Sequence, residues 1–360
     1  MHCRDLSRVA LTLLAALVGA QVFVWLRTPI PWMLGPLLVT ALASVLGAPT
    51  RSAAQLRNVG QWVIGAVLGL YFTPQVGALV LGLWWAIALA VLWALAQGAL
   101  LSAWLEHRHA ADGARGASQS WRATTYFAGA IGGASEMTLL AERHGGRTDW
   151  VAAAHSLRLV LVVLTLPFAM QWAQSHWNLQ VDARLLPVPA PSHMGGLLWL
   201  ALATAGGAAV MVWLKRTNPW FMGALLVSMG LTLLGLEGSS VPVGLSNAAQ
   251  LLIGVSLGVR FQREFIHTAP RWLASMAMGT GVLMLLSMGF GLLLAHATGL
   301  NPATLVMGTS PGGIAEMAIT AKVLQLGVPV VTAFQVCRLV AVLVLVEPIF
   351  KWCIRQDRAA

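Results

Sequence analysis

Charged residues are scarce in this sequence, and their scarcity excludes an ordinary soluble domain. Only 9% of the 360 residues are charged, whereas 58% are hydrophobic, and the mean hydropathy is +0.76. Soluble domains carry about 25% charged residues. The apolar runs are long, rich in Gly and Ala, and lack the alternation of a barrel strand, so they indicate membrane helices. We therefore expect an all-α polytopic membrane protein.

Cysteine is also rare, and several signatures of metal or nucleotide chemistry are missing. Cys3, Cys337 and Cys353 show no Cys-x-x-Cys spacing, which disfavours a disulfide framework or a zinc site. No Walker A pattern occurs, so an ATP-driven pump is not indicated. The histidines are scattered and mostly in predicted loops, which disfavours copper or iron oxygenase chemistry. We predict no metal, no cofactor and no enzymatic activity.

Four sequence blocks are present twice, in the same order. Such self-similarity indicates an internal duplication, which we divide into repeats at residues 1–180 and 181–360. The paired blocks are WLRTPIPWMLGPLLV at 25–39 with WLKRTNPWFMGALLV at 213–227, LRNVGQWVIGAVLG at 56–69 with LSNAAQLLIGVSLG at 245–258, GGASEM at 132–137 with GGIAEM at 312–317, and SLRLV at 156–160 with VCRLV at 336–340.

The apolar segments predict five spans in each repeat. The expected spans lie near 9–26, 32–48, 59–73, 78–105, 150–174, 194–214, 219–236, 247–260, 272–296 and 328–350. Two further segments, 123–143 and 303–323, contain the Gly-Gly-x-x-Glu-Met motif, and we expect each to be broken or re-entrant. An odd number of spans inverts the second repeat relative to the first, which is a recurrent design in transporters.

The distribution of positive charge favours this topology. With ten spans, nearly all Lys and Arg residues outside the membrane fall on the side of the two termini. The opposite side keeps only Arg27, Arg184 and Lys322. The positive-inside rule then assigns both termini to the cytoplasm. It also accounts for the net charge of +10 without nucleic acid, and we expect no direct nucleic-acid binding.

The repeated motif supplies the first candidate solute- or ion-binding residues. Its glycines permit a helix to break, and a carboxylate at membrane depth is usually functional, here as a proton or cation site. The candidates are Gly132, Gly133 and Glu136 in the first half and Gly312, Gly313 and Glu316 in the second.

Two arginines follow these motifs inside predicted spans. Arg158 and Arg338 could form ion pairs with Glu136 and Glu316 and hold each repeat together. Alternatively, a guanidinium beside the positive end of a half-helix could attract an anionic solute. Both readings stay open at the level of sequence.

Polar amides inside two matched spans complete the candidate site. They could line a solute pathway, although such amides more often form hydrogen bonds between helices. The residues are Asn58 and Gln61 in the first half and Asn247 and Gln250 in the second.

At these blocks the chain resembles the AbrB family of duplicated bacterial inner-membrane proteins. The resemblance covers nearly the whole chain and rests on the P-W-[MF]-[LM]-G, N-x-x-Q-x-x-I-G-x-x-L-G and G-G-x-x-E-M…R-L-V blocks, each present twice. It implies a multi-pass protein of the bacterial inner membrane. The family carries two labels, a regulator of gene expression and an ammonia monooxygenase. It is also similar to cation–proton antiporter and anion-transporter folds.

Three functions follow from these observations. The first is a secondary transporter of a small solute, anionic in one reading, coupled to H+ or Na+ within the lipid bilayer, as a monomer or an oligomer. The second is a membrane-embedded regulator or sensor that acts through a partner or a solute. The monooxygenase label is disfavoured, because the sequence offers no clustered metal ligands.

Overall fold

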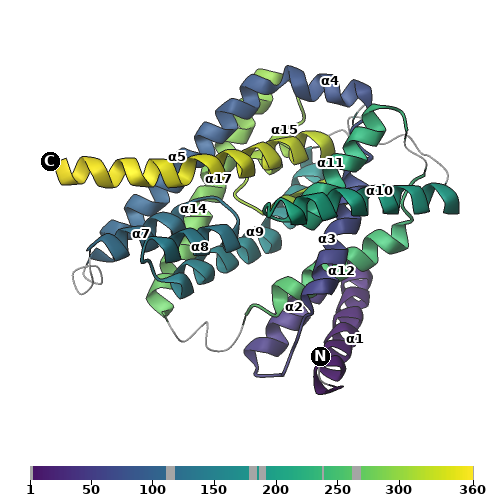
Figure 1. Ribbon diagram of the computed structural model, residues 1–360, viewed down its shortest axis with the longest axis horizontal. Coiled ribbons are helices and arrows are strands. Elements are labelled where there is room, and N and C mark those ends of the chain that lie inside the picture. The colour runs from purple at the N-terminus through teal and green to yellow at the C-terminus, as the bar shows by residue number, and fades with distance from the viewer. Residues whose placement is uncertain are drawn as a thin grey trace. The chain divides into compact units, whose positions relative to one another are not determined.

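The computed structural model describes residues 3–110, 118–177, 185, 192–236, 239–261 and 269–359, and its regular structure there is helical throughout (Figure 1). Six of these helices are long and apolar enough to cross a membrane. The predicted class, an all-α multi-pass membrane protein, is confirmed. The six helices are α1 (Cys3–Trp25), α5 (Trp84–Arg108), α9 (Thr148–Trp177), α10 (Met194–Trp213), α14 (Pro270–Thr298) and α17 (Val328–Ala359).

Several apolar helices are too short for a straight span. A span needs about 20 residues, whereas α2 (Pro31–Val45), α11 (Pro219–Leu233) and α12 (Val243–Gly258) are shorter.

The expected span 78–105 differs from the structure. Its first residues form the end of a separate helix, α4 (Pro74–Gly82), which follows α3 (Ala54–Gly69) at a bend of 90°. Pro74 explains the bend, because proline begins a helix well but cannot continue one.

Both motif segments are interrupted, as the sequence predicts. The first consists of α7 (Ser118–Gly129) and α8 (Ala134–Arg143), and the second of α15 (Pro302–Thr309) and α16 (Ile314–Val323). Residues 130–133 and 310–313 between them are not helical. We call these two stretches the first break and the second break. Whether each segment crosses the membrane or returns to the same face stays a prediction.

The chain divides into two compact units, and each takes segments from both halves of the sequence. Unit 1 comprises Met1–Gly82, Val163–His267 and Ala315–Thr332. Unit 2 comprises the remaining segments, Leu83–Val162, Thr268–Ile314 and Ala333–Ala360. The predicted repeat boundary at 180/181 lies outside the described residues. The inverted orientation of the repeats also stays a prediction.

Unit 1 is built on glycines that let helix backbones touch. Where α1 packs on α2, a Cβ atom on Gly19 would lie 2.9 Å from the carbonyl oxygen of Gly35. Where α10 packs on α11, a Cβ atom on Gly207 would lie 2.7 Å from the carbonyl oxygen of Gly223. Small residues that permit such close approach are the usual basis of helix packing in membranes. The two glycine pairs occupy matched positions of the repeated sequence.

A second pair of crossings in unit 1 joins the two halves of the sequence. Helix α3 packs on α11, and α12 packs on α2. A Cβ atom on Gly65 would collide with the carbonyl oxygen of Phe221, and one on Gly254 would lie 2.5 Å from that of Met33. Glycines of the repeated N-x-x-Q-x-x-I-G-x-x-L-G block therefore serve helix packing at these positions.

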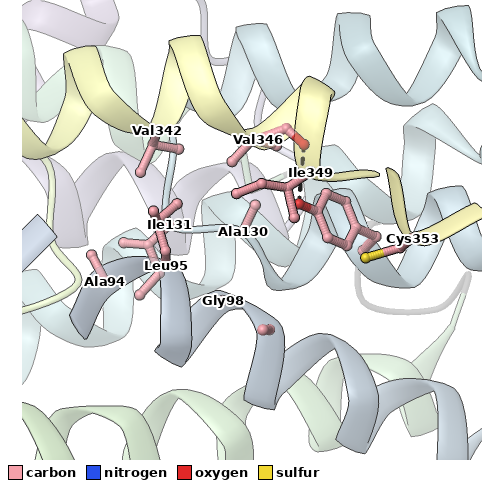
Figure 2. Close-up of a pocket in the computed structure, with 11 residues that line it drawn as sticks. Ala94, Leu95, Gly98, Ala130, Ile131, Val342, Val346, Ile349 and Cys353 are labelled. Carbon is pink, nitrogen blue, oxygen red and sulfur yellow. Dashed lines mark hydrogen bonds between the residues drawn. The ribbon is translucent and has the colours of Figure 1, made fainter. Parts of the chain in front are cut away.

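Unit 2 contains an apolar cavity of about 90 Å³ beside the first break (Figure 2). One wall comes from α5 and the opposite wall from α17, with Ala130 and Ile131 of the break between them. At one end of the cavity the hydroxyl of Tyr126 donates to the carbonyl oxygen of Val346 at 3.0 Å. The lining residues are Ala94, Leu95, Gly98, Ala99, Tyr126, Ala130, Ile131, Val342, Val346, Ile349 and Cys353.

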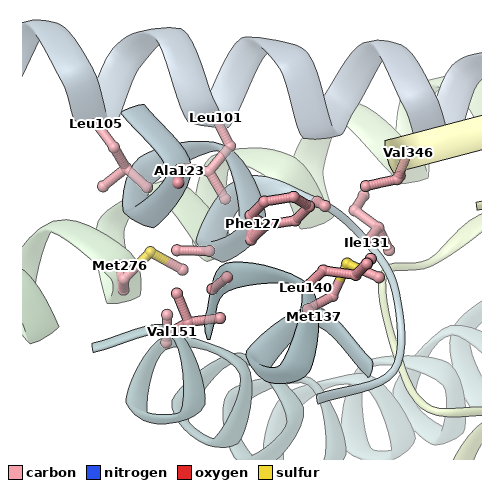
Figure 3. Close-up of a cluster of buried hydrophobic side chains, with 14 of the residues drawn as sticks. Leu101, Leu105, Ala123, Phe127, Ile131, Met137, Leu140, Val151, Met276 and Val346 are labelled. Atoms are coloured by element: carbon pink, nitrogen blue, oxygen red, sulfur yellow. The ribbon is translucent and has the colours of Figure 1, made fainter. Parts of the chain in front are cut away.

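The core of unit 2 continues from this cavity and holds α7 and α8 in place (Figure 3). Phe127 of α7 and Met137 of α8 are fully buried in it, together with Leu105 of α5. Val151 of α9 and Met276 of α14 belong to the same cluster. Burial of a large apolar side chain contributes about 1.5–3 kcal/mol, so several helices jointly fix the broken segment.

We predict that Gly207→Ala destabilises the protein, whereas Gly206→Ala does not. The added methyl at position 207 would meet the Gly223 backbone, which cannot move aside, and overpacking costs about 1–3 kcal/mol. A Cβ atom on Gly206 meets nothing within 4 Å, so this neighbour on α10 is a matched control. Thermal unfolding of both variants in detergent measures the effect. Equal melting temperatures would contradict the packing assigned to Gly207.

We predict that the ends of the two broken segments reach opposite membrane faces. Arg143 ends α8 and Val323 ends α16, and both side chains are exposed. Single cysteines at these positions, in a background without Cys3, Cys337 and Cys353, should react with an impermeant maleimide from the cytoplasmic and the external side respectively. Labelling is compared between intact cells and inside-out vesicles. Reaction from one and the same side would mean that the repeats are parallel.

Candidate functional site

The first break leaves backbone carbonyl groups without a partner in their own helix. Helix α7 ends at Gly129, and its last carbonyls cannot be satisfied by a following turn. The guanidinium of Arg158, on α9, donates to the carbonyl oxygens of Gly129 at 3.2 Å and Ala130 at 2.8 Å. Its charge also complements the negative end of the helix dipole. Arg158 therefore caps α7 from a neighbouring helix.

His155 supports this cap from one turn earlier on α9. Its Nε2 lies 2.9 Å from the carbonyl oxygen of Phe127, and its Nδ1 lies 2.7 Å from Nη2 of Arg158. A carbonyl only accepts and a guanidinium only donates, so Nε2 carries the proton and Nδ1 is the acceptor. This buried histidine is therefore satisfied by contacts within unit 2.

The second break is capped in the same way. Gln335 of α17 donates through Nε2 to the carbonyl oxygens of Met307 at 2.9 Å, Gly308 at 3.2 Å and Ser310 at 3.1 Å. Arg338, one turn later, donates to the carbonyl oxygens of Ser310 at 2.5 Å and Gly312 at 2.6 Å.

The caps of the two breaks correspond position by position. His155 and Gln335, which are 180 residues apart, each bond a carbonyl 28 residues earlier in the chain. Arg158 and Arg338 do the same, again with partners 28 residues earlier. Gln335 is the functional residue that the sequence analysis missed. Its signal was its place three residues before the arginine, where the first half has histidine.

The hydrogen bonds of the arginines test the predicted ion pair between Arg158 and Glu136. Arg158 and Glu136 belong to the same unit, and the described part of the chain shows no ion pair between them. Both guanidinium groups are instead committed to backbone carbonyls. The predicted ion pair is therefore wrong for Arg158, because its N–H groups donate to the backbone carbonyls that the break leaves without a helical partner.

The two arginines form a buried positive centre in unit 2. Arg158 is 3% exposed and Arg338 is 6% exposed, and the charge of Arg158 acts on Arg338. Nε of Arg338 is buried and has no hydrogen-bond partner within the described residues. Two cations in a buried site are costly unless an anion or hydrogen bonds compensate them, and here one donor is left without either.

The glutamates stand at the start of the half-helices that follow the breaks. Glu136 lies in the first turn of α8 and Glu316 in the first turn of α16, where a carboxylate complements the positive end of the helix dipole. Glu136 is partly exposed, and its carboxylate folds over Gly133, where an added Cβ atom would collide with it. Glu316 is 7% exposed, and Arg260 in the same unit interacts with it electrostatically.

The motif glycines leave steric room for neighbouring atoms, and they do not adopt unusual backbone angles. Gly133 has φ −68° and ψ 137°, which any residue can adopt. A Cβ atom on Gly132 would lie 2.8 Å from Cε of Met137. In the second break, Gly312 presents its carbonyl to Arg338 and its N–H to Ser310. Gly313 follows in the same non-helical stretch.

The four amides belong to unit 1, so the structure does not group them with the arginines. Asn58, with its amide oriented to satisfy both neighbours, donates to Ala54 and accepts from Nε1 of Trp220 at 3.1 Å. This bond joins α3 to α11 and matches the expected packing role. Gln250 is buried, whereas Gln61 and Asn247 are partly exposed.

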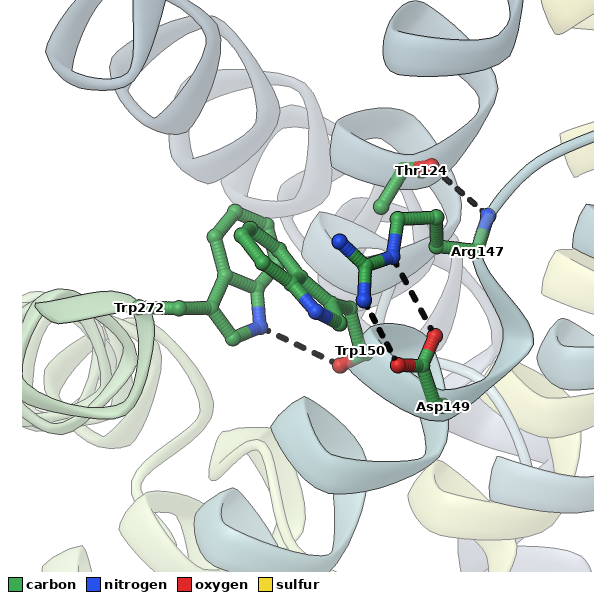
Figure 4. A network of polar contacts seen from close by, with 5 residues as sticks. All are labelled: Thr124, Arg147, Asp149, Trp150 and Trp272. Carbon is green, nitrogen blue, oxygen red and sulfur yellow. Dashed lines mark hydrogen bonds and ion pairs between the residues drawn. The ribbon is translucent and has the colours of Figure 1, made fainter. Parts of the chain in front are cut away.

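A polar cluster at the turn between α8 and α9 fixes the direction of the helix that carries Arg158 (Figure 4). Arg147 pairs with Asp149 at 2.9 Å and stacks on the ring of Trp150 at 4.3 Å. The backbone N–H of Arg147 donates to the hydroxyl of Thr124 at 2.9 Å. Nε1 of Trp272 donates to the carbonyl oxygen of Trp150 at 3.1 Å. These contacts join α7, α9 and α14 around the first break.

Metal ligands are not gathered in this part of the molecule. Within the described ranges, no three His, Cys, Asp or Glu side chains lie together in a way that could hold a metal ion.

Comparisons with known proteins agree with the motifs. Residues 32–354 match the family described as "Transition state regulatory protein AbrB". "Uncharacterized protein YhjN" of Bacillus subtilis strain 168 is 24% identical over 355 residues, covering 89% of this chain and 87% of the relative. "Putative regulator AbrB" of Escherichia coli strain K12 is 23% identical over 325 residues, covering 89% of both chains. Since the family match takes in both breaks and both capping arginines, this protein belongs to the AbrB family.

Proposed function

We propose that this chain is a secondary transporter of a small anionic solute, coupled to an ion gradient across the bacterial inner membrane. The observation that carries the proposal is the buried pair Arg158 and Arg338, held at two matched helix breaks. Interrupted helices at membrane depth are tolerated where they line a solute cavity. A buried positive centre that forms no ion pair within the described residues of unit 2 favours a negatively charged solute.

The coupling ion would act at the glutamates. Glu136 and Glu316 begin the half-helices that follow the breaks, and each carboxylate balances the positive end of its helix. Binding of H+ or Na+ neutralises the carboxylate, so that it no longer balances the positive end of the helix dipole. The local positive charge that results would attract the anionic solute. At Glu136, which shares unit 2 with both arginines, the cation and the anion would therefore bind together. In this proposal both termini are cytoplasmic and the two repeats are inverted.

We expect Glu136→Gln and Glu316→Gln to abolish coupled flux without preventing insertion, since glutamine keeps the size of the side chain but cannot bind a proton. The measurement uses proteoliposomes loaded with a pH-sensitive dye and a panel of small organic anions. Glu142→Gln is the matched control, because Glu142 is exposed near the end of the same helix as Glu136. Normal flux in both variants would remove the glutamates from the mechanism. Absence of wild-type flux with every anion would refute the transporter.

A regulatory role is the second candidate. It is favoured by the descriptions of the family and of the Escherichia coli relative, both of which refer to regulation. We propose that any such effect is indirect and follows from the level of the transported solute. Expression of affected genes should then change when wild type is deleted and stay changed when Glu136→Gln replaces it. Full restoration by that transport-inactive variant would instead identify a sensor that acts through a partner. Transcript levels in the three strains distinguish these outcomes.

A further inference from the structure

A partly buried histidine lies where the first broken segment ends. His144 follows the last residue of α8 and caps that helix, because its backbone N–H donates to the carbonyl oxygens of Leu140 and Ala141, each at 3.2 Å. The turn after it is fixed to α7, where the hydroxyl of Ser120 donates to the carbonyl oxygen of Gly145 at 2.5 Å. The imidazole of His144 therefore has a defined place at the C-terminus of α8.

The ring of His144 contacts phenylalanines from two different helices. It stacks on Phe127 of α7, with ring centroids 5.7 Å apart, and makes an edge contact with Phe350 of α17 at 4.9 Å. Both phenylalanines belong to the buried cluster around the first break, where Figure 3 shows Phe127 at the centre. His144 thus joins the end of the first broken segment to α17, the helix that caps the second break through Gln335 and Arg338.

A carboxylate of α17 completes the surroundings of this ring. Nε2 of His144 lies 3.4 Å from Oε1 of Glu347, and Nζ of Lys351 lies 2.7 Å from the same oxygen. A separation of 3.4 Å is long for an N–H···O hydrogen bond, whose usual length is about 2.9 Å. Accordingly, Nε2 is buried and makes no hydrogen bond within the described residues. While the imidazole is neutral, the contact between His144 and Glu347 is therefore loose.

The protonated ring fits these surroundings better than the neutral ring. An imidazolium forms a charge-assisted hydrogen bond with a carboxylate, is attracted to aromatic faces and complements the negative C-terminal end of a helix. Glu347, the two phenylalanines and α8 supply all three to His144. Two features oppose the charge, namely the ammonium of Lys351 on the same oxygen and the 16% exposure of the imidazole. Three favourable contacts outnumber them.

Other titratable side chains on α7, at the end of α8 and at the start of α9 do not replace Glu347 as the partner. Each is exposed or bonded elsewhere. They are Glu142 and Arg143, which are exposed, Arg122, which pairs with Glu106, Arg147, which pairs with Asp149, Tyr126, which donates to Val346, and His155, which is bonded to Phe127.

We propose that His144 and Glu347 form a pH-dependent contact, which holds the end of the first broken segment against α17 when His144 is protonated and releases it when His144 is neutral. Histidine ordinarily changes charge between about pH 5 and pH 8, so the contact tightens as the pH falls through that range. Because α8 begins with the turn that carries Glu136, and α17 carries Arg338, the contact links the two breaks. It does so whether or not the protein transports a solute.

Spin labels on Leu139 of α8 and Val344 of α17 test this movement, because both side chains are exposed and both helical positions belong to unit 2. The labels are attached to cysteines in the full chain, in a background without Cys3, Cys337 and Cys353. The distribution of distances between them is measured in nanodiscs at about pH 5 and about pH 8, the two ends of the histidine range. We expect a narrower distribution at the lower pH.

Two substitutions separate the titrating group from its partner. His144→Gln should keep the broad distribution at both pH values, because glutamine does not titrate. Glu347→Gln should do the same, because the imidazolium then lacks its carboxylate. His107→Gln is the matched control, since His107 is exposed in the last turn of α5, and it should respond like the unsubstituted chain. A distribution that ignores pH in the unsubstituted chain would overturn the proposal, and so would a response that survives His144→Gln.

Thermal unfolding gives an independent measure of the pair. We expect His144→Gln to lower the melting temperature by about 2 °C more at about pH 5 than at about pH 8. Lys351→Gln should enlarge this difference, because it removes the cation that competes for Oε1 of Glu347. In Glu347→Gln, the added His144→Gln should have the same effect at both pH values. A difference that persists in Glu347→Gln, or that vanishes in Lys351→Gln, would contradict the assigned pair.

Discussion

A backbone carbonyl without a hydrogen bond cannot persist inside a membrane, and the rest of this site depends on that constraint. Each broken segment exposes carbonyls at the end of its first half-helix. Arg158 with His155, and Arg338 with Gln335, supply donors from long neighbouring helices. The donors bring positive charge to the same place, because arginine is the side chain that can serve several carbonyls at once. The need to satisfy these carbonyls therefore also places positive charge at the breaks, and the proposal of an anionic solute is built on that charge.

The two units differ in how their helices pack. Unit 1 relies on glycine contacts in which backbone meets backbone, as at Gly35 and Gly223, so its helices have little freedom to shift. Unit 2 combines such contacts, as at Gly98 and Gly129, with large side chains packed around interrupted helices, where Phe127 and Met137 are fully buried. It also leaves a cavity open beside the first break. The features that suggest solute binding are therefore concentrated in the unit with the less regular backbone.

Much of this arrangement could be predicted from sequence, because each prediction depended on local chemistry. Gly-Gly before Glu in an apolar segment indicated both breaks, and long apolar runs indicated most of the membrane helices. The partners of Arg158 could not be predicted, since spacing shows that a cation is present but not whether a carboxylate or a carbonyl reaches it first. The separation of α4 from α5 at Leu83 was hidden inside a continuous apolar run. The capping role of Gln335 emerged only when its three carbonyl partners were seen.

The matched caps are chemically unequal. In the first break the Nδ1 atom of His155 accepts from Arg158, and in the second break an amide that cannot titrate occupies the corresponding position. A proton added to His155 would turn this acceptor into a donor that faces another donor, and the bond would be lost. No protonation event can do the same to Gln335. The duplicated architecture thus closes its two breaks by different means, since the first cap depends on a neutral imidazole in one tautomer and the second on an amide.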